Sequence, residues 1–434
     1  MSANKEAKKQ PEFRQLTVMF LITVFQFITS ACVIFKDEEV NMNLVYIFFG
    51  YICVEWIYMM FNVLITGNDY FELEAIAFFL SGIGLTICAT FSESYALKQA
   101  VAIGLGMITY LIILLLIKDV RVASFLRYPA AIGSVLLLAV NLVLAKTTNG
   151  ALNWIEVGSV SIQPSEFVKV AFILVGAVSL DKLLSNASLT KYIIFSLTCV
   201  GALFLMRDFG TALIFFFTFI LIAYMRSGDI RTIFLICAVA LMGAVLVIYF
   251  KPYVANRFAA YRHVWEYSDT TGYQQTKVLI YSASGGLLGL GIGEGYLRNV
   301  FAASTDLIFG VICEEMGLII GVAVLVAFAC IAIFAVRAAK GSASSFYAIA
   351  AVAAAGMLLF QLALNVFGVT DLLPLTGVTL PFVSRGGSSM ICSWGLLAYI
   401  RAAGAPFKLP SPDVAISKNR PQQIKQSKRG GASV

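Results

Sequence analysis

The sequence carries little charge for its length, and this excludes several classes of protein. Charged residues make up 13% of the 434 residues, whereas an average soluble domain has roughly 25%. Hydrophobic residues make up 60% and gather in runs of about 20 residues, the length that crosses a hydrocarbon core of about 30 Å. These runs exclude a soluble enzyme, a disordered protein and a nucleic-acid-binding protein.

Histidine, paired cysteines and nucleotide motifs are scarce or missing. His263 is the only histidine, which argues against a Ser/His protease within the membrane. The eight cysteines fall inside apolar runs and form no CxxC pair, which argues against a zinc site. The glycine run from Gly285 to Gly295 matches neither G-x-G-x-x-G nor a P-loop, so we expect a close-packed turn there.

What the sequence does contain predicts an all-α polytopic membrane protein with about twelve transmembrane helices. Only helices and closed barrels satisfy their backbone in lipid, and these runs do not alternate like barrel strands. The expected spans are 16–35, 43–65, 73–91, 99–117, 129–145, 165–180, 192–206, 209–225, 232–250, 307–335, 346–367 and 387–402.

Basic residues predict how the chain is oriented. With a cytoplasmic N-terminal tail at 1–15, the inner segments carry 20 of the 31 Lys and Arg residues and the outer segments carry 10. We therefore expect both termini in the cytoplasm and a large external loop at 251–305. Residues 146–164 form a second outer loop, and 403–434 read as a basic, disordered cytoplasmic tail.

Charged residues within or beside the spans are costly, by roughly 2.5–3.5 kcal/mol at the centre on insertion scales, and usually mark a site. Glu166 and Lys169 are three residues apart, so they can pair on one helix face. Asp208 interrupts two apolar runs. Asp306 starts a span and Glu314 is rotated from it by about 80° on a helical wheel, so the two could line one cavity.

Structural roles remain open for each of these residues. The Glu166–Lys169 pair could be a structural ion pair, and Asp208 could be a helix-end carboxylate. Asp306 could be a helix cap that favours the macrodipole. Glu315 lies about 180° from Asp306 on the same wheel, so we expect it to pack against another helix.

Five ordered blocks between about residues 73 and 402 resemble the SEDS proteins (shape, elongation, division and sporulation). The blocks are Asn153-Trp154-Ile155 with Gln163-Pro164-Ser165-Glu166 and Lys169; Arg207-Asp208-Phe209-Gly210-Thr211; Arg257 to Glu266 with Gly272-Tyr273-Gln274; Ser304-Thr305-Asp306-Leu307-Ile308-Phe309 with Glu314-Glu315-Met316-Gly317; and Leu373 to Gly377 with Pro381 to Ser389.

The resemblance implies a ten-helix core over 73–402, so 16–72 would hold two additional N-terminal helices, which we expect to be peripheral. It also implies a peptidoglycan glycosyltransferase of the bacterial cytoplasmic membrane. Such an enzyme polymerises lipid II into glycan strands and releases undecaprenyl pyrophosphate during division, elongation or sporulation. The implied partners are a class B penicillin-binding transpeptidase and other divisome or elongasome membrane proteins.

The resemblance also assigns roles to single residues. Asp306 takes the place of the family's catalytic aspartate. The implied substrate-binding residues are Arg257, Glu166, Lys169, Asp208, Gln274, Glu314 and Ser388. The sequence departs from the family at Ser304, which replaces the usual histidine, at Arg385, which replaces a tyrosine, and at Asp371, which replaces a small residue.

The implied reaction needs few parts. Direct inversion at the anomeric carbon requires a base for the attacking 4-hydroxyl, typically worth 10²–10⁴-fold in rate, and Asp306 is the candidate. The departing pyrophosphate would be stabilised by Arg257, Lys169 or Arg385, or by a divalent cation, Mg²⁺ or Mn²⁺. No other cofactor is expected.

Two other functions remain as alternatives. A lipid II flippase or transporter would use the intramembrane Glu166, Lys169, Asp208 and Glu314 to line a path. A non-catalytic divisome or elongasome scaffold would keep the motifs for partner binding. Position discriminates between them, because a catalyst needs its acid at the outer surface and a flippase needs polar groups through the midplane.

Overall fold

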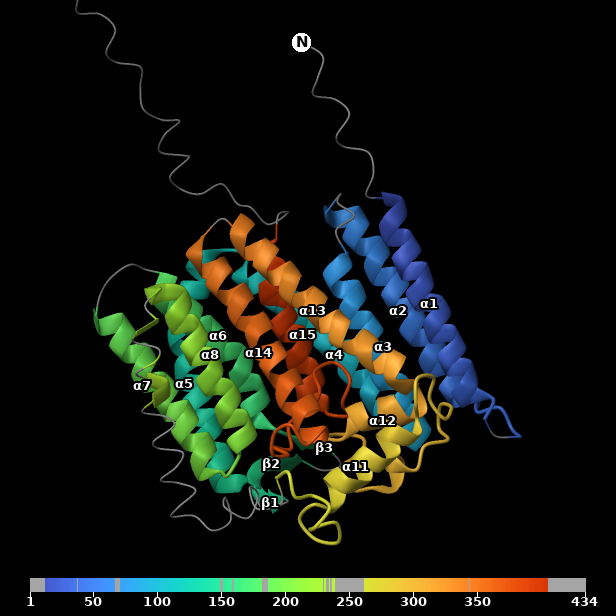
Figure 1. Cartoon of the computed structure of the whole chain (residues 1–434). Coiled ribbons are helices and arrows are strands. Elements are labelled where there is room, and N and C mark those ends of the chain that lie inside the picture. The colour runs from blue at the N-terminus through green and yellow to red at the C-terminus, as the bar shows by residue number, and fades with distance from the viewer. Residues whose placement is uncertain are drawn as a thin grey trace, which may run out of the picture.

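A computed structural model shows a bundle of long helices with a layer of short elements at one end (Figure 1). It describes residues 12–36, 38–66, 71–148, 151–157, 160–181, 186–228, 230, 231, 234, 236–238, 261–342 and 344–404. Most of the predicted tails 1–15 and 403–434, Arg257 and most of the predicted span 232–250 lie outside these residues.

The long helices follow the apolar runs of the sequence. They are α1 (Glu12–Ile34), α2 (Met42–Thr66), α3 (Glu72–Phe91), α4 (Glu93–Ile117), α5 (Val120–Leu144), α6 (Pro164–Asp181), α7 (Asn186–Leu205), α8 (Phe209–Ser227), α13 (Gly317–Gly341), α14 (Ser345–Val369) and α15 (Gly387–Ala403).

Among the described helices, eight are long and apolar enough to cross a membrane: α1, α2, α3, α4, α5, α8, α13 and α14. The others fall short for visible reasons, because α6 carries Glu166, Lys169 and Asp181, and α15 has only 17 residues. The apolar part of α7 covers 190–205. The predicted class, an all-α multi-pass membrane protein, is confirmed.

The predicted span 307–335 is wrong in one respect, because it is two helices. α12 (Ile308–Glu315) ends before Gly317, which starts α13 with φ +86°. A Cβ at Gly317 would lie 2.3 Å from the Leu287 carbonyl oxygen, so only glycine fits this left-handed position. α12 therefore belongs to the layer at the end of the bundle.

Both predicted outer loops contain regular structure. Three strands form an antiparallel sheet in the order β1 (Lys146–Thr148), β2 (Ala151–Val157), β3 (Val160–Ile162), with Ile155 opposite Ile162. The described part of the 251–305 loop holds α11 (Tyr273–Ser284) and a 3₁₀ turn η1 (Leu297–Asn299). The sheet, α11 and α12 lie together at the same end of the bundle (Figure 1).

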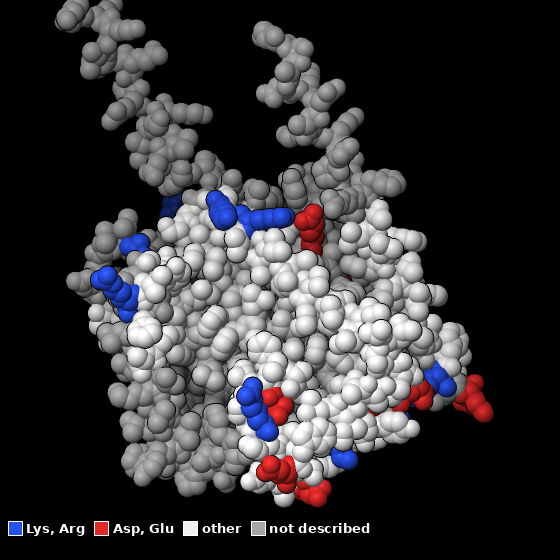
Figure 2. Space-filling view, in the orientation of Figure 1, with Lys and Arg blue, Asp and Glu red and all other residues white. Residues whose placement is uncertain are grey.

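The bundle has two polar ends. On the face shown in Figure 2, Lys, Arg, Asp and Glu gather at the two ends and leave the middle free of charge, as expected for a belt in lipid. α1 begins and α15 ends at the upper end, opposite the sheet and α11 (Figure 1). This fits a chain whose termini share one side, while which side is cytoplasmic stays a prediction.

The N-terminal helices α1 and α2 lie at the edge of the bundle, beside α3 and α4 (Figure 1). The Tyr51 hydroxyl donates to the Phe78 carbonyl oxygen at 2.7 Å. The Thr29 and Thr86 hydroxyls lie 3.5 Å apart. The pair is thus packed on the rim of the bundle.

Candidate functional site

The connection between α14 and α15, residues 370–386, returns into the bundle without helical structure. Non-helical backbone at such depth is tolerated only where protein buries it or it lines a cavity. Two of its backbone carbonyl groups accept hydrogen bonds from amide side chains of α14. Gln361 donates to the Thr379 carbonyl oxygen at 2.9 Å, and Asn365 donates to the Val378 carbonyl oxygen at 2.7 Å. α14 therefore shapes this connection.

Asp306 lies against that connection. The Asn365 amide also donates to the Asp306 carbonyl oxygen at 2.8 Å, and the Ser384 hydroxyl donates to the Thr305 carbonyl oxygen at 2.5 Å. A Cβ at Gly377 would lie 3.4 Å from Asp306 Oδ2. The side chain of Asp306 is half-buried, so it faces the connection and keeps some access to solvent.

Two of the family departures meet beside Asp306. The Arg385 backbone N–H donates to the Ser304 carbonyl oxygen at 2.8 Å. The Arg385 guanidinium lies 3.9 Å from the centroid of the Tyr95 ring on α4, a cation–π contact that fixes its position. The backbone of Arg385 is therefore held at Ser304, two residues before Asp306, while its guanidinium is held on Tyr95.

Asp306 does not cap α12 through a hydrogen bond, because Leu307 is the N-cap residue and no side chain caps that helix. Asp306 directly precedes this N-cap residue, so a favourable interaction of its carboxylate with the helix macrodipole stays a prediction.

Asp208 gathers three motif blocks. It is the N-cap of α8, where its Oδ1 accepts from the Thr211 N–H at 3.1 Å. Its Oδ2 accepts from Asn153 at 3.1 Å and from Gln163 at 3.2 Å. The Gln163 N–H in turn lies 3.3 Å from the Ser388 hydroxyl oxygen. The helix-end interpretation of Asp208 is right, and its second oxygen also holds the segment before α6.

Asp208 and Asp306 belong to one cluster. A Cβ at Gly210, in the first turn of α8, would lie 2.4 Å from the Val378 side chain, so α8 packs directly on the 370–386 connection. The pKa of the Asp306 carboxyl is raised to about 7, chiefly by burial and in part by the negative charge of Asp208, while a hydrogen bond with Thr305 opposes the rise. A carboxyl with a pKa near neutrality suits a general base.

Glu166 and Lys169 form the predicted pair. Lys169 Nζ lies 2.7 Å from Glu166 Oε1, with both side chains at most 5% exposed. Lys169 also donates to Gln361 at 3.0 Å. α6 starts at Pro164, whose fixed φ favours the first helical position. The pair therefore supports the amide that holds the 370–386 connection.

Glu314 does not share a cavity with Asp306, contrary to the prediction. Its carboxylate accepts from the backbone N–H groups of Tyr296 at 2.7 Å and Leu297 at 3.0 Å. Glu315 accepts from the Gly293 N–H at 2.8 Å, and so does not pack on a helix face as expected. The wheel failed because Asp306 lies outside the helix that carries both acids.

The glycine run forms the expected close-packed turn. The left-handed residues include Gly289 and Gly293. A Cβ at Gly289 would lie 2.3 Å from the Glu315 carbonyl oxygen, and one at Gly285 would lie 2.2 Å from the Cys313 carbonyl oxygen. This turn is clamped onto α12.

The remaining predicted residues lie as follows. The Gln274 amide donates to the Phe301 carbonyl oxygen at 3.0 Å, so it supports the segment that leads to Asp306. Ser388 is buried beside Gln163. Arg257 is not among the described residues. Within the described ranges no three His, Cys, Asp or Glu side chains come together to hold a metal ion.

Sequence reasoning missed Gln361 and Asn365. Both are neutral amides, so they lack the charge by which site residues within a span were recognised. A signal was available, because the two are four residues apart in an otherwise apolar helix and so share one face.

An apolar cavity of about 380 Å³ borders α12. It is lined by residues of α11, α12, α13 and the end of α14, among them Val278, Phe309, Leu318 and Val369. It lies where these helices meet, between the end layer and the bundle.

Comparison with known proteins gives the class first. Residues 78–404 match the FtsW/RodA/SpoVE family, described as cell cycle proteins. Since the match covers more than half of the chain, the chain belongs to this family. The resemblance inferred from the sequence is thus confirmed.

Individual relatives agree. The chain is 33% identical to stage V sporulation protein E of Bacillus subtilis over 56% of this chain and 68% of that protein. It is 29% identical to the peptidoglycan glycosyltransferase RodA of Mycobacterium tuberculosis over 68% of this chain and 67% of that protein. It is 31% identical to a probable peptidoglycan glycosyltransferase FtsW of Wigglesworthia glossinidia over 62% of this chain and 74% of that protein. The enzyme class predicted from the sequence is the one that the last two names carry.

Solved structures share the fold. One is a chain from a study of the structural coordination of polymerization and crosslinking by a peptidoglycan synthase complex. It has a TM-score of 0.64 and 26% identity, over 76% of this chain and 96% of that chain. Another is the rod shape determining protein RodA of Thermus thermophilus, with a TM-score of 0.57 and 25% identity, over 76% and 94%.

Proposed function

We propose that the chain is a peptidoglycan glycosyltransferase that polymerises lipid II into glycan strands, with inversion at the anomeric carbon and release of undecaprenyl pyrophosphate. The observation that carries the proposal is the position of Asp306. Its half-buried carboxyl, with a pKa raised to about 7, lies in the end layer that holds the sheet and α11. The sugar and pyrophosphate of a lipid-linked donor must lie at such a boundary.

In this reaction the oxygen of the sugar 4-hydroxyl attacks the anomeric carbon, and the bond from that carbon to the pyrophosphate breaks. Asp306 accepts the proton that the hydroxyl loses. A positioned base of this kind typically contributes 10²–10⁴-fold. Asp208 accepts three hydrogen bonds from Thr211, Asn153 and Gln163, so its part is to hold the site together.

Charge on the departing pyrophosphate needs a cation. Lys169 already has Glu166 and Gln361 as acceptors and is 1% exposed, so it is poorly placed for this role. Arg385 is half-buried, and its backbone bonds to Ser304 beside Asp306. Arg385 is therefore the better candidate of the two, and Arg257 remains a proposal.

Mg²⁺ or Mn²⁺ also remains a proposal. Because the described residues form no metal-binding group, such an ion would arrive with the substrate pyrophosphate. Polymerisation in EDTA, followed by addition of either ion, would show whether one is required.

A class B penicillin-binding transpeptidase is the partner we propose. The similarity to a chain of a peptidoglycan synthase complex supports a partner of this kind. The relatives include a stage V sporulation protein, and one of the similar solved structures is a rod shape determining protein, so the choice between division, elongation and sporulation stays open.

The test is an assay of the purified protein with lipid II, alone and with a co-expressed transpeptidase, with glycan strands separated by length. Formation of strands supports the proposal. Transfer of lipid II across vesicle membranes without polymerisation would instead favour a flippase. Partner binding without either activity would favour a scaffold.

A further inference from the structure

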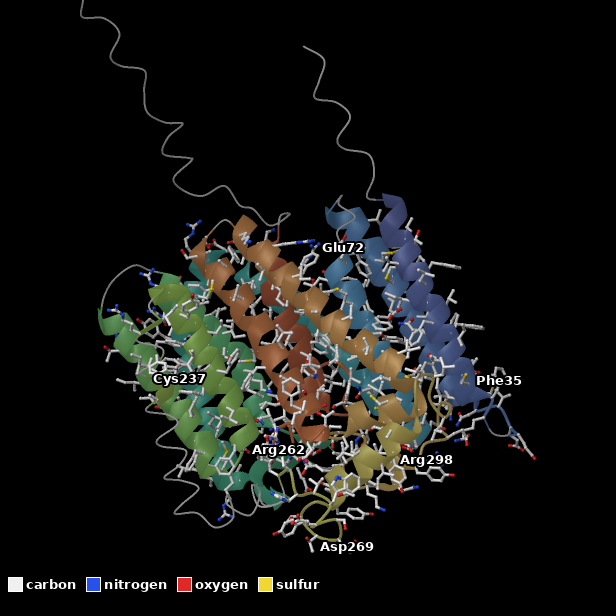
Figure 3. The ribbon with its side chains drawn as sticks, in the orientation of Figure 1. Phe35, Glu72, Cys237, Arg262, Asp269 and Arg298 are labelled. Atoms are coloured by element: carbon white, nitrogen blue, oxygen red, sulfur yellow. The ribbon has the colours of Figure 1, made fainter. Side chains whose placement is uncertain are left out.

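The end of α1 reaches into the layer that carries the proposed site. Lys36 lies two residues after the end of α1. Its Nζ donates to the Gly293 carbonyl oxygen and forms an ion pair with Glu294 Oε1 at 3.2 Å. Its side chain is only 27% exposed. A lysine that follows the end of α1 is thus held on the glycine-rich turn. Its chain neighbour Phe35 and the nearby Arg298 are labelled in Figure 3.

Gly293 is also held from α12. Its N–H donates to Glu315 Oε2 at 2.8 Å, and its carbonyl oxygen also accepts from Arg298 at 2.9 Å. Its φ is +79°, and a Cβ would lie 2.9 Å from Lys36 Nζ. One residue therefore links the end of α1 to the helix that Asp306 precedes.

A second set of contacts joins the start of α2 and the residue before it to the start of α4. Asn41 and Asn43 donate to the two carboxylate oxygens of Glu93, at 3.1 and 2.8 Å. Glu93 opens α4, and two residues later Tyr95 stacks on Arg385. Arg385 in turn donates its N–H to Ser304. Two chains of contacts therefore lead from the region between α1 and α2 toward Asp306. One runs through Gly293 to α12, and the other runs through α4 and Arg385 to Ser304.

These helices lie outside the part of the chain that matches the family, which begins at residue 78. We propose that the α1–α2 pair positions the catalytic segment, with Lys36 as a positioning residue that fixes the glycine-rich turn and, through it, α12 and Asp306. This inference rests on the proposed polymerase function. Loosening the turn would misplace the base, and small displacements of catalytic groups can cost as much as about 10²-fold in rate.

The experiment compares Lys36→Met, Lys36→Arg and the control Lys98→Met in the full-length protein. Lys98 lies on α4 and is exposed. Two assays are used. Steady-state kinetics on lipid II gives kcat and KM, and amide hydrogen exchange is followed over 289–299 and 308–315. We expect Lys36→Met to lower kcat about tenfold at unchanged KM and to speed exchange in both segments. Lys36→Arg should restore both, because a guanidinium can also donate to Gly293 and Glu294.

Wild-type kcat in Lys36→Met overturns the positioning role, whatever the exchange shows. A lower kcat without faster exchange also overturns it, as does an equal loss in Lys98→Met. If the wild-type protein makes no glycan, the polymerase function fails. Exchange in Lys36→Met then still decides whether Lys36 holds the turn, because it needs no activity.

Discussion

Asp306 and Asp208 lie in one polar cluster, yet their surroundings prepare them for different work. Asp208 is 7% exposed and its two oxygens are used by a helix N-terminus and two amides. Asp306 precedes its helix, is half-buried, and has a pKa raised to about 7 chiefly by burial. The first carboxylate holds elements together, and the second is the proposed base.

The pH dependence of polymerisation should report this difference. A base acts in its ionised form, so kcat/KM should fall as pH drops below about 7 and level off above it. Asp208→Asn removes a negative charge that raises the pKa of Asp306, so the acid limb should move to lower pH. Initial rates from pH 5 to 9 on both proteins check this. An acid limb near pH 4 in the wild-type protein would contradict it.

The Glu166–Lys169 pair should be needed for stability. Lys169→Met leaves Glu166 buried without its cation, which typically costs about 3–5 kcal/mol. The double variant Glu166→Gln/Lys169→Met removes both charges and should recover most of this loss. Thermal unfolding in detergent measures the effect. Single variants as stable as the wild type would mean that the pair has no structural role.

At the scale of elements, the end layer is fastened to the bundle by tight turns. α12 and α13 are separated at Gly317, which packs directly against the backbone of Leu287 and Gly289. Glu314 and Glu315 then bind the turn that ends at η1. A continuous helix over 307–335 could not make these contacts, so the break is what places α12 in the layer of the site.

Gly317→Ala should therefore be strongly destabilising. Its φ of +86° costs an L-residue about 1–3 kcal/mol, and the added Cβ would also press on the Leu287 carbonyl oxygen. Gly104→Ala is the matched control, because Gly104 is within α4 with nothing within 4 Å of an added Cβ; it should be neutral or stabilising. Detergent-solubilised yield and melting temperature distinguish the two. Equal behaviour would show that the break is not required.

The sequence predicted the spans well and the connections poorly, for physical reasons. Spans are set by apolar length, which is read directly. Glu314 and Glu315 do interrupt the apolar run just before Gly317, but acids alone do not end a helix. The left-handed turn at Gly317 depends on contacts with Leu287 that no local pattern shows. The strands at 146–162 are only three to seven residues long. The amides Gln361 and Asn365 carry no charge, so the cost of burying them was overlooked.

At the scale of the whole molecule, the bundle supports the proposed site at one of its two ends. The charge-free middle visible in Figure 2 separates that end from the end where α1 begins and α15 finishes. Glu74 and Arg401 form an ion pair at 3.1 Å at this second end and tie α3 to α15. The proposed reaction requires the end with Asp306 to be outside the cell.

Orientation can be tested directly. Single cysteines at exposed Asp269 in the outer segment and Lys340 at the far end of α13, in a chain freed of its own cysteines, should differ in labelling. An impermeant thiol reagent applied to intact cells should label position 269 and spare 340, as the 20 to 10 division of basic residues predicts. The reverse pattern would place the proposed site in the cytoplasm and sink the proposed function.

The most direct test of the central claim is the polymerisation rate of Asp306→Asn with purified lipid II and transpeptidase partner. Asp269→Asn is the control, since it makes the same change at an exposed acid of the same outer segment, far from Asp306 in sequence and labelled at the bottom of Figure 3. Asparagine is nearly isosteric but cannot take the proton, so Asp306→Asn should insert, bind lipid II and polymerise at least about 10²-fold more slowly. Asp269→Asn should match the wild type. Glycan synthesis by Asp306→Asn within a few-fold of wild type would contradict the account.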